Sequence, residues 1–210
     1  MKIERLVVGP LQTNVYAVVN DNNQALIIDP GADGHRIVNW INENNWQVQA
    51  ILITHGHFDH IGALDDVRAS LGVEAYIGSK DQELLSRPDL NVSALFMPQL
   101  PVTQDECEQT WPVEDGEVRV GNFKFRVESI PGHTPGSSVY IFDDLKAVFT
   151  GDVLFKSSIG RTDFPQGNLT SLLTGIKDKL LTLPGDYSVY PGHNDPTTIE
   201  AEKLTNPFLQ

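Results

Sequence analysis

Short runs of β-branched and aromatic residues alternate with turn residues over the first 30 positions. Residues 3–8, 15–19 and 25–28 form three such runs, separated by a Gly-Pro pair and by an Asp-Asn-Asn triplet. Runs of this length bounded by Gly, Pro, Asn and Asp are typical of strands joined by tight turns. The pattern therefore predicts a meander of antiparallel strands at the start of the chain.

Helical periodicity follows this meander. Ile37, Val38 and Ile41 share one helical face, and Asp33 is placed to cap the start of that helix. Residues 50–53 are then uniformly apolar, which predicts a buried strand.

A second and a third helix are predicted after this strand. The second has four apolar residues on one face, namely Ile61, Leu64, Val67 and Leu71. Gly72 provides its stop signal. Ser79 and Gln82 have the spacing of a capping box, which predicts a short third helix.

Residues 88–116 contain four prolines and show little periodicity. We interpret them as an irregular surface connection between two halves of the molecule. A connection at this point is placed to overhang a site.

The strand pattern returns in the second half and is followed by another helix. Five strands are expected, at residues 118–120, 123–130, 138–142, 147–149 and 187–190. Helical spacing before the last strand links Leu169, Leu172, Leu173, Ile176 and Leu180. The order of strands and then helices thus occurs twice. This predicts an α/β protein, a single domain over residues 1–210, in which two sheets pack face to face with helices outside, as an αββα four-layer sandwich.

The charge balance narrows the range of partners. The chain has 210 residues, with 28 Asp and Glu against 15 Lys and Arg and a formal net charge of −13. Nucleic acids and anionic membranes are bound through clustered Lys and Arg. We therefore expect no nucleic-acid or membrane partner and a small-molecule substrate instead.

Cysteine content and hydropathy indicate a cytoplasmic protein. Cys107 is the single cysteine, so no intrachain disulfide can form. Residues 1–10 lack the apolar run of a signal peptide, and no apolar stretch approaches the roughly 20 residues of a membrane span. Cys107 lies between two glutamates that oppose thiolate formation, so we expect it to be structural.

Candidate chemistry is concentrated in residues 55–60, which read His-Gly-His-Phe-Asp-His directly after the buried strand. His55 and His57 are two positions apart on an extended turn and can reach one cation. Asp59 and His60 are displaced by the turn into a helix and point at a second position. The motif therefore fits two adjacent metals better than one.

Three further predicted strands end in Gly followed by a candidate ligand. These pairs are Gly132-His133, Gly151-Asp152 and Gly192-His193. Glycine lets the backbone turn sharply and approach a crowded centre. If the four strand ends lie together, seven ligands meet at one edge of the sandwich: His55, His57, Asp59, His60, His133, Asp152 and His193. Five imidazoles and two carboxylates suit Zn first, with Fe or Mn as alternatives, and do not suit Ca or Mg.

The motif H-x-H-x-D-H, followed in order by a separate His, Asp and His, closely resembles the metallo-β-lactamase superfamily. The resemblance covers nearly the whole chain and implies the αβ/βα sandwich. It also implies His55, His57 and His133 on one metal, with Asp152 bridging to a second metal. The ligands implied for that second metal are Asp59, His60 and His193.

Several segments look like the glyoxalase II (hydroxyacylglutathione hydrolase) branch of that superfamily. They are Ile28-Asp29-Pro30-Gly31, Gly132-His133-Thr134-Pro135-Gly136-Ser137, Thr150-Gly151-Asp152-Val153-Leu154-Phe155, Tyr190-Pro191-Gly192-His193 and Thr205-Asn206-Pro207-Phe208-Leu209. The likeness implies hydrolysis of thioesters of small 2-hydroxy acids, with Arg161 in contact with the thiol carrier. Only 17 residues follow His193, so the chain resembles a short form without the helical C-terminal extension, and the carrier thiol stays open.

A mechanism follows as a hypothesis. A hydroxide bridging the two metals attacks the thioester carbonyl, and Asp59 orients it as ligand and hydrogen-bond acceptor. Asp29 holds a ligand imidazole by its second nitrogen. The simpler interpretations are that Asp29 only ends a strand before a turn, and that Arg161 forms a surface ion pair with Asp163.

Other functions stay open at this stage. A non-haem iron persulfide dioxygenase is the main alternative, since the resemblance permits it, and a lactonase is another. A scaffold that keeps a metal only for folding is a third. A β-lactamase is disfavoured because Asp152 stands where a metal-binding Cys would be expected and no export signal is seen. The tRNA-processing members need a basic surface that a net charge of −13 does not provide.

Overall fold

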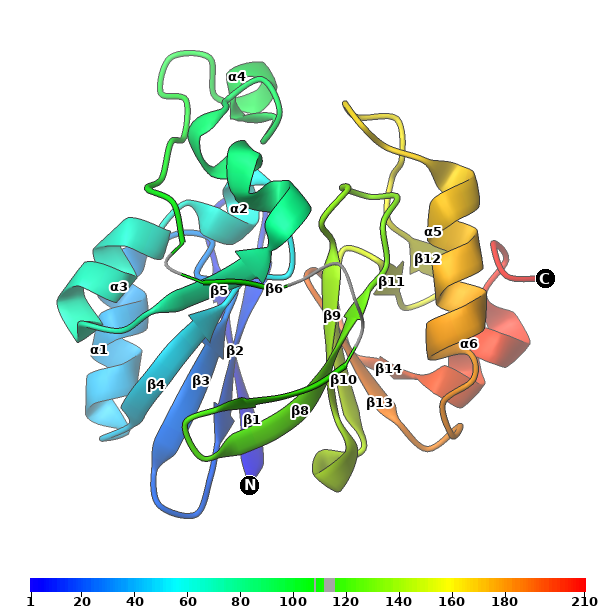
Figure 1. The fold of residues 1–210 in the computed structure, drawn as a ribbon, viewed down its shortest axis with the longest axis horizontal. Coiled ribbons are helices and arrows are strands. Elements are labelled where there is room, and N and C mark those ends of the chain that lie inside the picture. The colour runs from blue at the N-terminus through cyan, green and yellow to red at the C-terminus, as the bar shows by residue number, and fades with distance from the viewer. Residues whose placement is uncertain (108, 112–115) are drawn as a thin grey trace.

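Two mixed sheets face each other and form the centre of the molecule (Figure 1). The computed structural model describes residues 1–107, 109–111 and 116–210. In this part of the chain the first sheet has the order β1 (Lys2–Val8), β2 (Thr13–Val19), β3 (Gln24–Ile28), β4 (Gln47–Leu52), β5 (Ala75–Gly78) and β6 (Gln109–Trp111). The second has the order β14 (Thr197–Thr198), β13 (Ser188–Pro191), β10 (Ala147–Gly151), β9 (Ser138–Phe142), β8 (Phe123–Ser129) and β7 (Gly116–Val120).

The N-terminal meander is confirmed. β1, β2 and β3 pair antiparallel, whereas β4, β5 and β6 each join the sheet in parallel. Every residue of β2 is buried, because the strand is covered by helices on one face and by the second sheet on the other. The parallel pairing brings the carboxyl ends of β3, β4 and β5 to the same edge of the sheet.

Helices cover the outer face of each sheet, which confirms the predicted αββα arrangement (Figure 1). α1 (Gly34–Glu43) and α3 (Leu64–Leu71) lie on the first sheet, and α5 (Leu169–Gly175) and α6 (Ile199–Thr205) lie on the second. The layer between the sheets is rich in aromatic residues, including Phe125 stacked on Phe142 with ring centroids 4.9 Å apart. Among the described residues, none of the helices has the length and apolar character needed to cross a membrane.

The predicted cap of α1 is wrong. Asp33 does precede the helix, but its φ of 56° is left-handed and its side chain accepts no bond from the first helical turn. Its carboxylate instead accepts a hydrogen bond from the Gly9 N–H at 3.0 Å. A contact between loops 24 residues apart thus replaces the local cap.

The predicted second helix is divided into α2 (Phe58–Ile61) and α3. At the break, the Ala63 N–H donates to the Pro30 carbonyl at 3.0 Å. Gly62 lets this loop approach, since a Cβ there would lie 2.4 Å from the Gly31 oxygen. Gly72 ends α3 with a φ of 65°, as predicted.

The third helix forms without its predicted capping box. Ser79–Ser86 is a 3₁₀ helix with no side-chain cap, and Gln82 donates to the Cys107 carbonyl at 3.1 Å. The expected irregular connection 88–116 contains the short helix α4 (Ser93–Phe96) and strand β6. Its residues 108 and 112–115 lie outside the described residues.

The second half follows the expected strand order with a change in its helix. α5 is capped by Asn168, whose side chain accepts from the Ser171 N–H at 2.9 Å. The helix then continues as a π-helical turn over Ile176–Leu180 instead of a regular α-helix. A small hairpin of β11 (Leu154–Phe155) and β12 (Ser158–Ile159) follows β10.

Candidate metal centre

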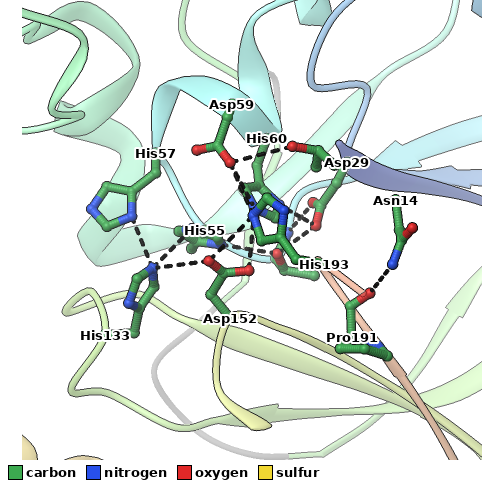
Figure 2. Close-up of polar contacts among 12 residues, drawn as sticks. Asn14, Asp29, His55, His57, Asp59, His60, His133, Asp152, Pro191 and His193 are labelled. Carbon is green, nitrogen blue, oxygen red and sulfur yellow. Dashed lines mark hydrogen bonds and ion pairs between the residues drawn. The ribbon is translucent and has the colours of Figure 1, made fainter. Parts of the chain in front are cut away.

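Four loops bring the seven predicted ligands together at one edge of the sandwich, as Figure 2 shows. The loop after β4 carries His55 and His57 and leads into α2, which carries Asp59 and His60; the loops after β8, β10 and β13 carry His133, Asp152 and His193. The first loop belongs to one sheet and the other three belong to the second sheet. The site therefore lies between the two halves of the molecule, at one edge of the sandwich.

The first group consists of three buried histidines, His55, His57 and His133. Nε2 of His133 lies 3.2 Å from Nε2 of His55 and 2.9 Å from Nδ1 of His57. Two nitrogens bound to one tetrahedral zinc, each at about 2.0–2.1 Å, lie about 3.3–3.4 Å apart. The observed spacing is close to that of three ligands on a common cation.

The second group consists of Asp59, His60 and His193. Nε2 of His193 lies 3.1 Å from Oδ2 of Asp59 and 3.4 Å from Nε2 of His60. Asp59 also accepts a hydrogen bond from Oγ1 of Thr13 at 3.3 Å, which fixes the carboxylate from the side of β2. This set offers two nitrogens and one oxygen to a second cation.

Asp152 lies between the two groups. Its Oδ1 is 3.3 Å from Nε2 of His60, and its Oδ2 is 3.6 Å from Nε2 of both His133 and His193. One carboxylate thus faces ligands of both groups, which is the position that a bridging ligand needs.

The remaining ring nitrogens of four histidines face acceptors, which sets their tautomers. The pairs are His55 Nδ1 with Thr54 Oγ1 at 3.1 Å, His60 Nδ1 with Asp29 Oδ2 at 2.9 Å, His133 Nδ1 with the Arg161 carbonyl at 2.8 Å, and His193 Nδ1 with the Leu11 carbonyl at 3.1 Å. A proton held on the outer nitrogen leaves the inner nitrogen with a free lone pair. When the inner nitrogens carry no proton, their four lone pairs converge and can bind metal ions.

Asp29 reaches the site from the end of β3. It accepts hydrogen bonds from the Thr54 N–H at 2.7 Å and from Thr54 Oγ1 at 2.6 Å, as well as facing His60. Its backbone has a left-handed φ of 54°. Strained backbone of this kind persists where the surrounding structure fixes it, and it is concentrated at functional sites.

Burial and charge set the protonation of the cluster. Burial, assisted by the neighbouring His133, lowers the pKa of His57 to about 3, and burial with the His60 charge lowers the pKa of His55. Burial raises the pKa of Asp152, but the charge of His60 outweighs it and lowers that pKa overall. Burial lowers the pKa of His60, but the charges of the neighbouring carboxylates outweigh it and raise that pKa overall. Metal binding needs neutral imidazoles beside ionised carboxylates, so His60 would release a proton when a metal binds.

Glycine is required where the loops meet, as predicted. A Cβ on Gly192 would lie 2.4 Å from Oδ1 of Asp152 and 2.5 Å from Cε1 of His60. Gly151 has a φ of 48°, and a Cβ there would lie 2.3 Å from Oγ1 of Thr54. These contacts leave no room for a side chain next to the ligands.

Sequence reasoning missed Asp81, a buried carboxylate that joins two ligand loops. It accepts hydrogen bonds from the Gly56 N–H at 2.9 Å, the Gly136 N–H at 2.6 Å and Thr134 Oγ1 at 2.6 Å. Gly56 lies between two ligands of the first group, and Thr134 follows the third. The sequence did contain an indication of this role, because Asp81 shortly follows a strand that ends in Gly78, and three of the predicted ligands also follow a strand and a glycine.

Asn14 was missed as well. Its side chain donates to the Pro191 carbonyl at 2.9 Å, which ties β2 to the end of β13 (Figure 2). Pro191 lies two positions before His193, so this bond positions a ligand loop. A buried Asn inside an apolar strand is the signal that could have identified it.

A pocket of about 290 Å³ opens over the cluster. Its walls beyond the ligands are Leu11, Phe58, Val92, Phe96, Arg161 and Phe164. Val92 and Phe96 belong to the predicted connection, so that segment does overhang the site. The pocket combines an apolar wall with a cluster able to activate water.

Arg161 lines this pocket and also pairs with Asp163. The guanidinium donates to both carboxylate oxygens at 2.7 Å and lies over the ring of Phe164, 3.7 Å from its centroid. Both sequence interpretations of Arg161 are therefore compatible with its position. His35 is exposed on α1, and Cys107 is buried within the first-sheet core.

Known proteins resemble the chain over its full length. It is 43% identical to the probable metallo-hydrolase YqgX of Bacillus subtilis and 38% identical to the hydroxyacylglutathione hydrolase GloC of Haemophilus influenzae. Each match covers 100% of this chain and 98% of the relative.

Two solved structures share the fold closely. The BLEG-1 B3 metallo-beta-lactamase superposes with a TM-score of 0.96 at 39% identity, covering 100% of both chains. TTHA1623 in a di-iron-bound form has a TM-score of 0.87 at 34% identity, covering 98% of this chain and 100% of that one. The family model of the metallo-beta-lactamase superfamily matches residues 8–193. This chain therefore belongs to the metallo-beta-lactamase superfamily of metal-dependent hydrolases.

Proposed function

We propose that the protein hydrolyses thioesters of small 2-hydroxy acids, in the manner of a hydroxyacylglutathione hydrolase. The convergence of seven ligating side chains from four loops, with Asp152 facing both groups, carries this proposal. The 38% identity to GloC supports the thioester class. In this proposal His55, His57 and His133 would hold one cation, Asp59, His60 and His193 would hold another, and Asp152 would be shared between them.

Two divalent cations held by these residues would lower the pKa of bound water to about 7 and would polarise a substrate carbonyl. The chain supplies the orientation. Oδ2 of Asp59 is held by Thr13 and by His193, so it presents a fixed acceptor for the attacking water. Asp29 and the outer carbonyl groups keep the imidazoles aimed inward.

A thioester suits this pocket because of its leaving group. Apart from the ligands, the described residues that line the pocket offer no Lys, Tyr or carboxylic acid that could protonate a departing atom. A thiol has a pKa of about 8.5, so a thiolate leaves without a general acid. Alkoxide and amide leaving groups lack this advantage.

The cations are proposed to be zinc, with iron or manganese as alternatives. The imidazole-rich ligand set accepts each of these metals. The similar TTHA1623 structure is described in a di-iron-bound form, which supports iron as the second choice. We also propose a cytoplasmic location and a small-molecule substrate, from the charge of −13 and the single buried cysteine.

The experiment is a hydrolysis assay on lactoylglutathione, followed by the loss of thioester absorbance, together with metal analysis of the same sample. His57→Ala is expected to reduce bound metal and activity together, and the matched control is His35→Ala, on the exposed face of α1. Protein carrying two metals per chain that cleaves no thioester would contradict the proposal. Oxygen uptake with a persulfide would instead indicate the dioxygenase, and ring opening of a lactone would indicate the lactonase.

A second candidate is β-lactam hydrolysis. The structural match to the BLEG-1 B3 metallo-beta-lactamase, at 39% identity, favours it. The same metal-loaded sample assayed with a chromogenic cephalosporin distinguishes the two candidates. We expect kcat/KM for the thioester to exceed that for the cephalosporin.

A further inference from the structure

A second cavity opens beside the metal centre and has no part in the chemistry described so far. Its volume is about 390 Å³, larger than the pocket over the cluster. The two share Leu11, Phe58 and Asp59 in their walls. The second cavity, here called the side cavity, therefore adjoins Asp59, the residue proposed to orient the attacking water. A molecule that reacts beside Asp59 can extend into both spaces.

Apolar side chains form most of the wall of the side cavity. Most of them come from the loop between β1 and β2 and from the segment after α4, namely Pro10, Leu11, Met97, Leu100, Pro101 and Val102. Leu11 is 44% exposed and Leu100 is 71% exposed. When a ligand covers exposed apolar side chains that line a hollow, the free energy falls and the bound state is stabilised.

The charges of the two spaces differ. Among the described residues lining the side cavity there is no Lys or Arg, and its two carboxylates are Asp33 and Asp59. An anionic group would meet repulsion there without a compensating cation. The pocket over the cluster has the guanidinium of Arg161. A charged thiol carrier is thus favoured on the Arg161 side, which leaves the side cavity for the acyl end of the substrate.

We propose that the side cavity binds the acyl chain of the substrate, and that the protein prefers 2-hydroxyacyl thioesters with an extended apolar chain over the lactoyl ester. This inference rests on the proposed thioester hydrolysis. A volume of about 390 Å³ lies within the range of about 300–1,000 Å³ typical of small-ligand pockets, and the single methyl group of a lactoyl ester leaves most of it empty. Each methylene that becomes fully buried strengthens binding by about fourfold.

The test compares 2-hydroxyoctanoyl, 2-hydroxyhexanoyl and lactoyl esters of glutathione on zinc-loaded protein. We expect kcat/KM to rise with chain length and to be at least about tenfold higher for the 2-hydroxyoctanoyl thioester than for the lactoyl thioester. Leu100→Gln removes apolar surface from the cavity wall without adding charge, and it is expected to lower this ratio at least about threefold. Leu95→Gln is the matched control, because Leu95 is 68% exposed on α4 and lines neither space.

Binding of the free acids separates this inference from the proposed function. Isothermal titration with 2-hydroxyoctanoate and with lactate measures the chain-length preference without hydrolysis. The side cavity is supported if 2-hydroxyoctanoate binds more tightly than lactate and if this difference in affinity is lost in Leu100→Gln but kept in Leu95→Gln. This result would hold even if no thioester is cleaved. Equal affinity for the two acids, or a preference that Leu100→Gln leaves unchanged, overturns the inference.

Discussion

Oδ2 of Asp29 lies 2.9 Å from Nδ1 of His60, and this contact links the end of β3 to the second group of ligands. The same carboxylate accepts two hydrogen bonds from Thr54, the residue before the first ligand. Asp29 thus meets three donors, and it does so from a left-handed backbone that few residues adopt. The arrangement explains why an acidic side chain is needed at the turn into Pro30.

Asp29→Asn is expected to weaken the binding of one cation by about 10-fold to 100-fold. An amide tolerates the left-handed φ, but its NH₂ group would face one of the three donors. Chelator competition on the purified protein measures the affinity. Asp33→Asn is the matched control, since Asp33 also has a left-handed φ, of 56°, and its carboxylate contacts the Gly9 N–H and the Arg36 guanidinium, neither of which is a ligand. Equal metal affinity in the two variants would argue against a role for Asp29.

Asp81→Asn is expected to lower the free energy of unfolding by about 2–3 kcal/mol in metal-free protein. The fully buried carboxylate accepts three hydrogen bonds, and an amide would leave at least one of these donors without an acceptor. Urea denaturation measures the change. Asp89→Asn, at an exposed ion pair with Arg87, is expected to unfold at the wild-type midpoint. A wild-type midpoint for Asp81→Asn as well would refute this role.

Arg161→Gln and Asp163→Asn are expected to change the KM for a glutathione thioester in opposite directions. Loss of the guanidinium removes a partner for the carrier carboxylates, which raises KM about twofold to fivefold. Loss of Asp163 frees the guanidinium from its present pair and lowers KM. Steady-state kinetics on lactoylglutathione give both values. If both substitutions shifted KM in the same direction, the intact ion pair, and not the free guanidinium, would be what substrate binding requires.

Metal removal is expected to lower the melting temperature. A cation that binds only the folded chain adds about 4 kcal/mol of stability when its free concentration is 1,000 times its Kd. The effect is expected here because the cluster joins loops from both sheets. Calorimetry before and after dialysis against a chelator measures it, and zinc should restore the original value. An unchanged melting temperature would mean that these side chains hold no cation tightly.

The sequence predicted the features that depend on local pattern. The meander over β1–β3 and the alternation of strands with ligand-bearing glycine turns follow from short-range periodicity, and so does the sandwich. The convergence of residues 55–60 with His133, Asp152 and His193 was also predictable, because parallel strands end at a common edge. These features need no knowledge of side-chain packing.

Features that depend on long-range contacts were not predictable in this way. Asp33 has the residue type of a helix cap, but Gly9 competes for its carboxylate across 24 positions. Asp81 looked like an ordinary helix residue, and its partners lie 25 or more positions away. The side cavity is similarly formed by segments that are far apart in the chain, within residues 9–13, 31–33, 58–62 and 97–104.

The most direct measurement is anomalous X-ray diffraction from crystals of the zinc-loaded protein, with data collected above and below the zinc absorption edge. We predict two anomalous peaks, one enclosed by His55, His57 and His133 and the other by Asp59, His60 and His193, with Asp152 between them. A single peak, or peaks that lie away from these residues, would contradict the account.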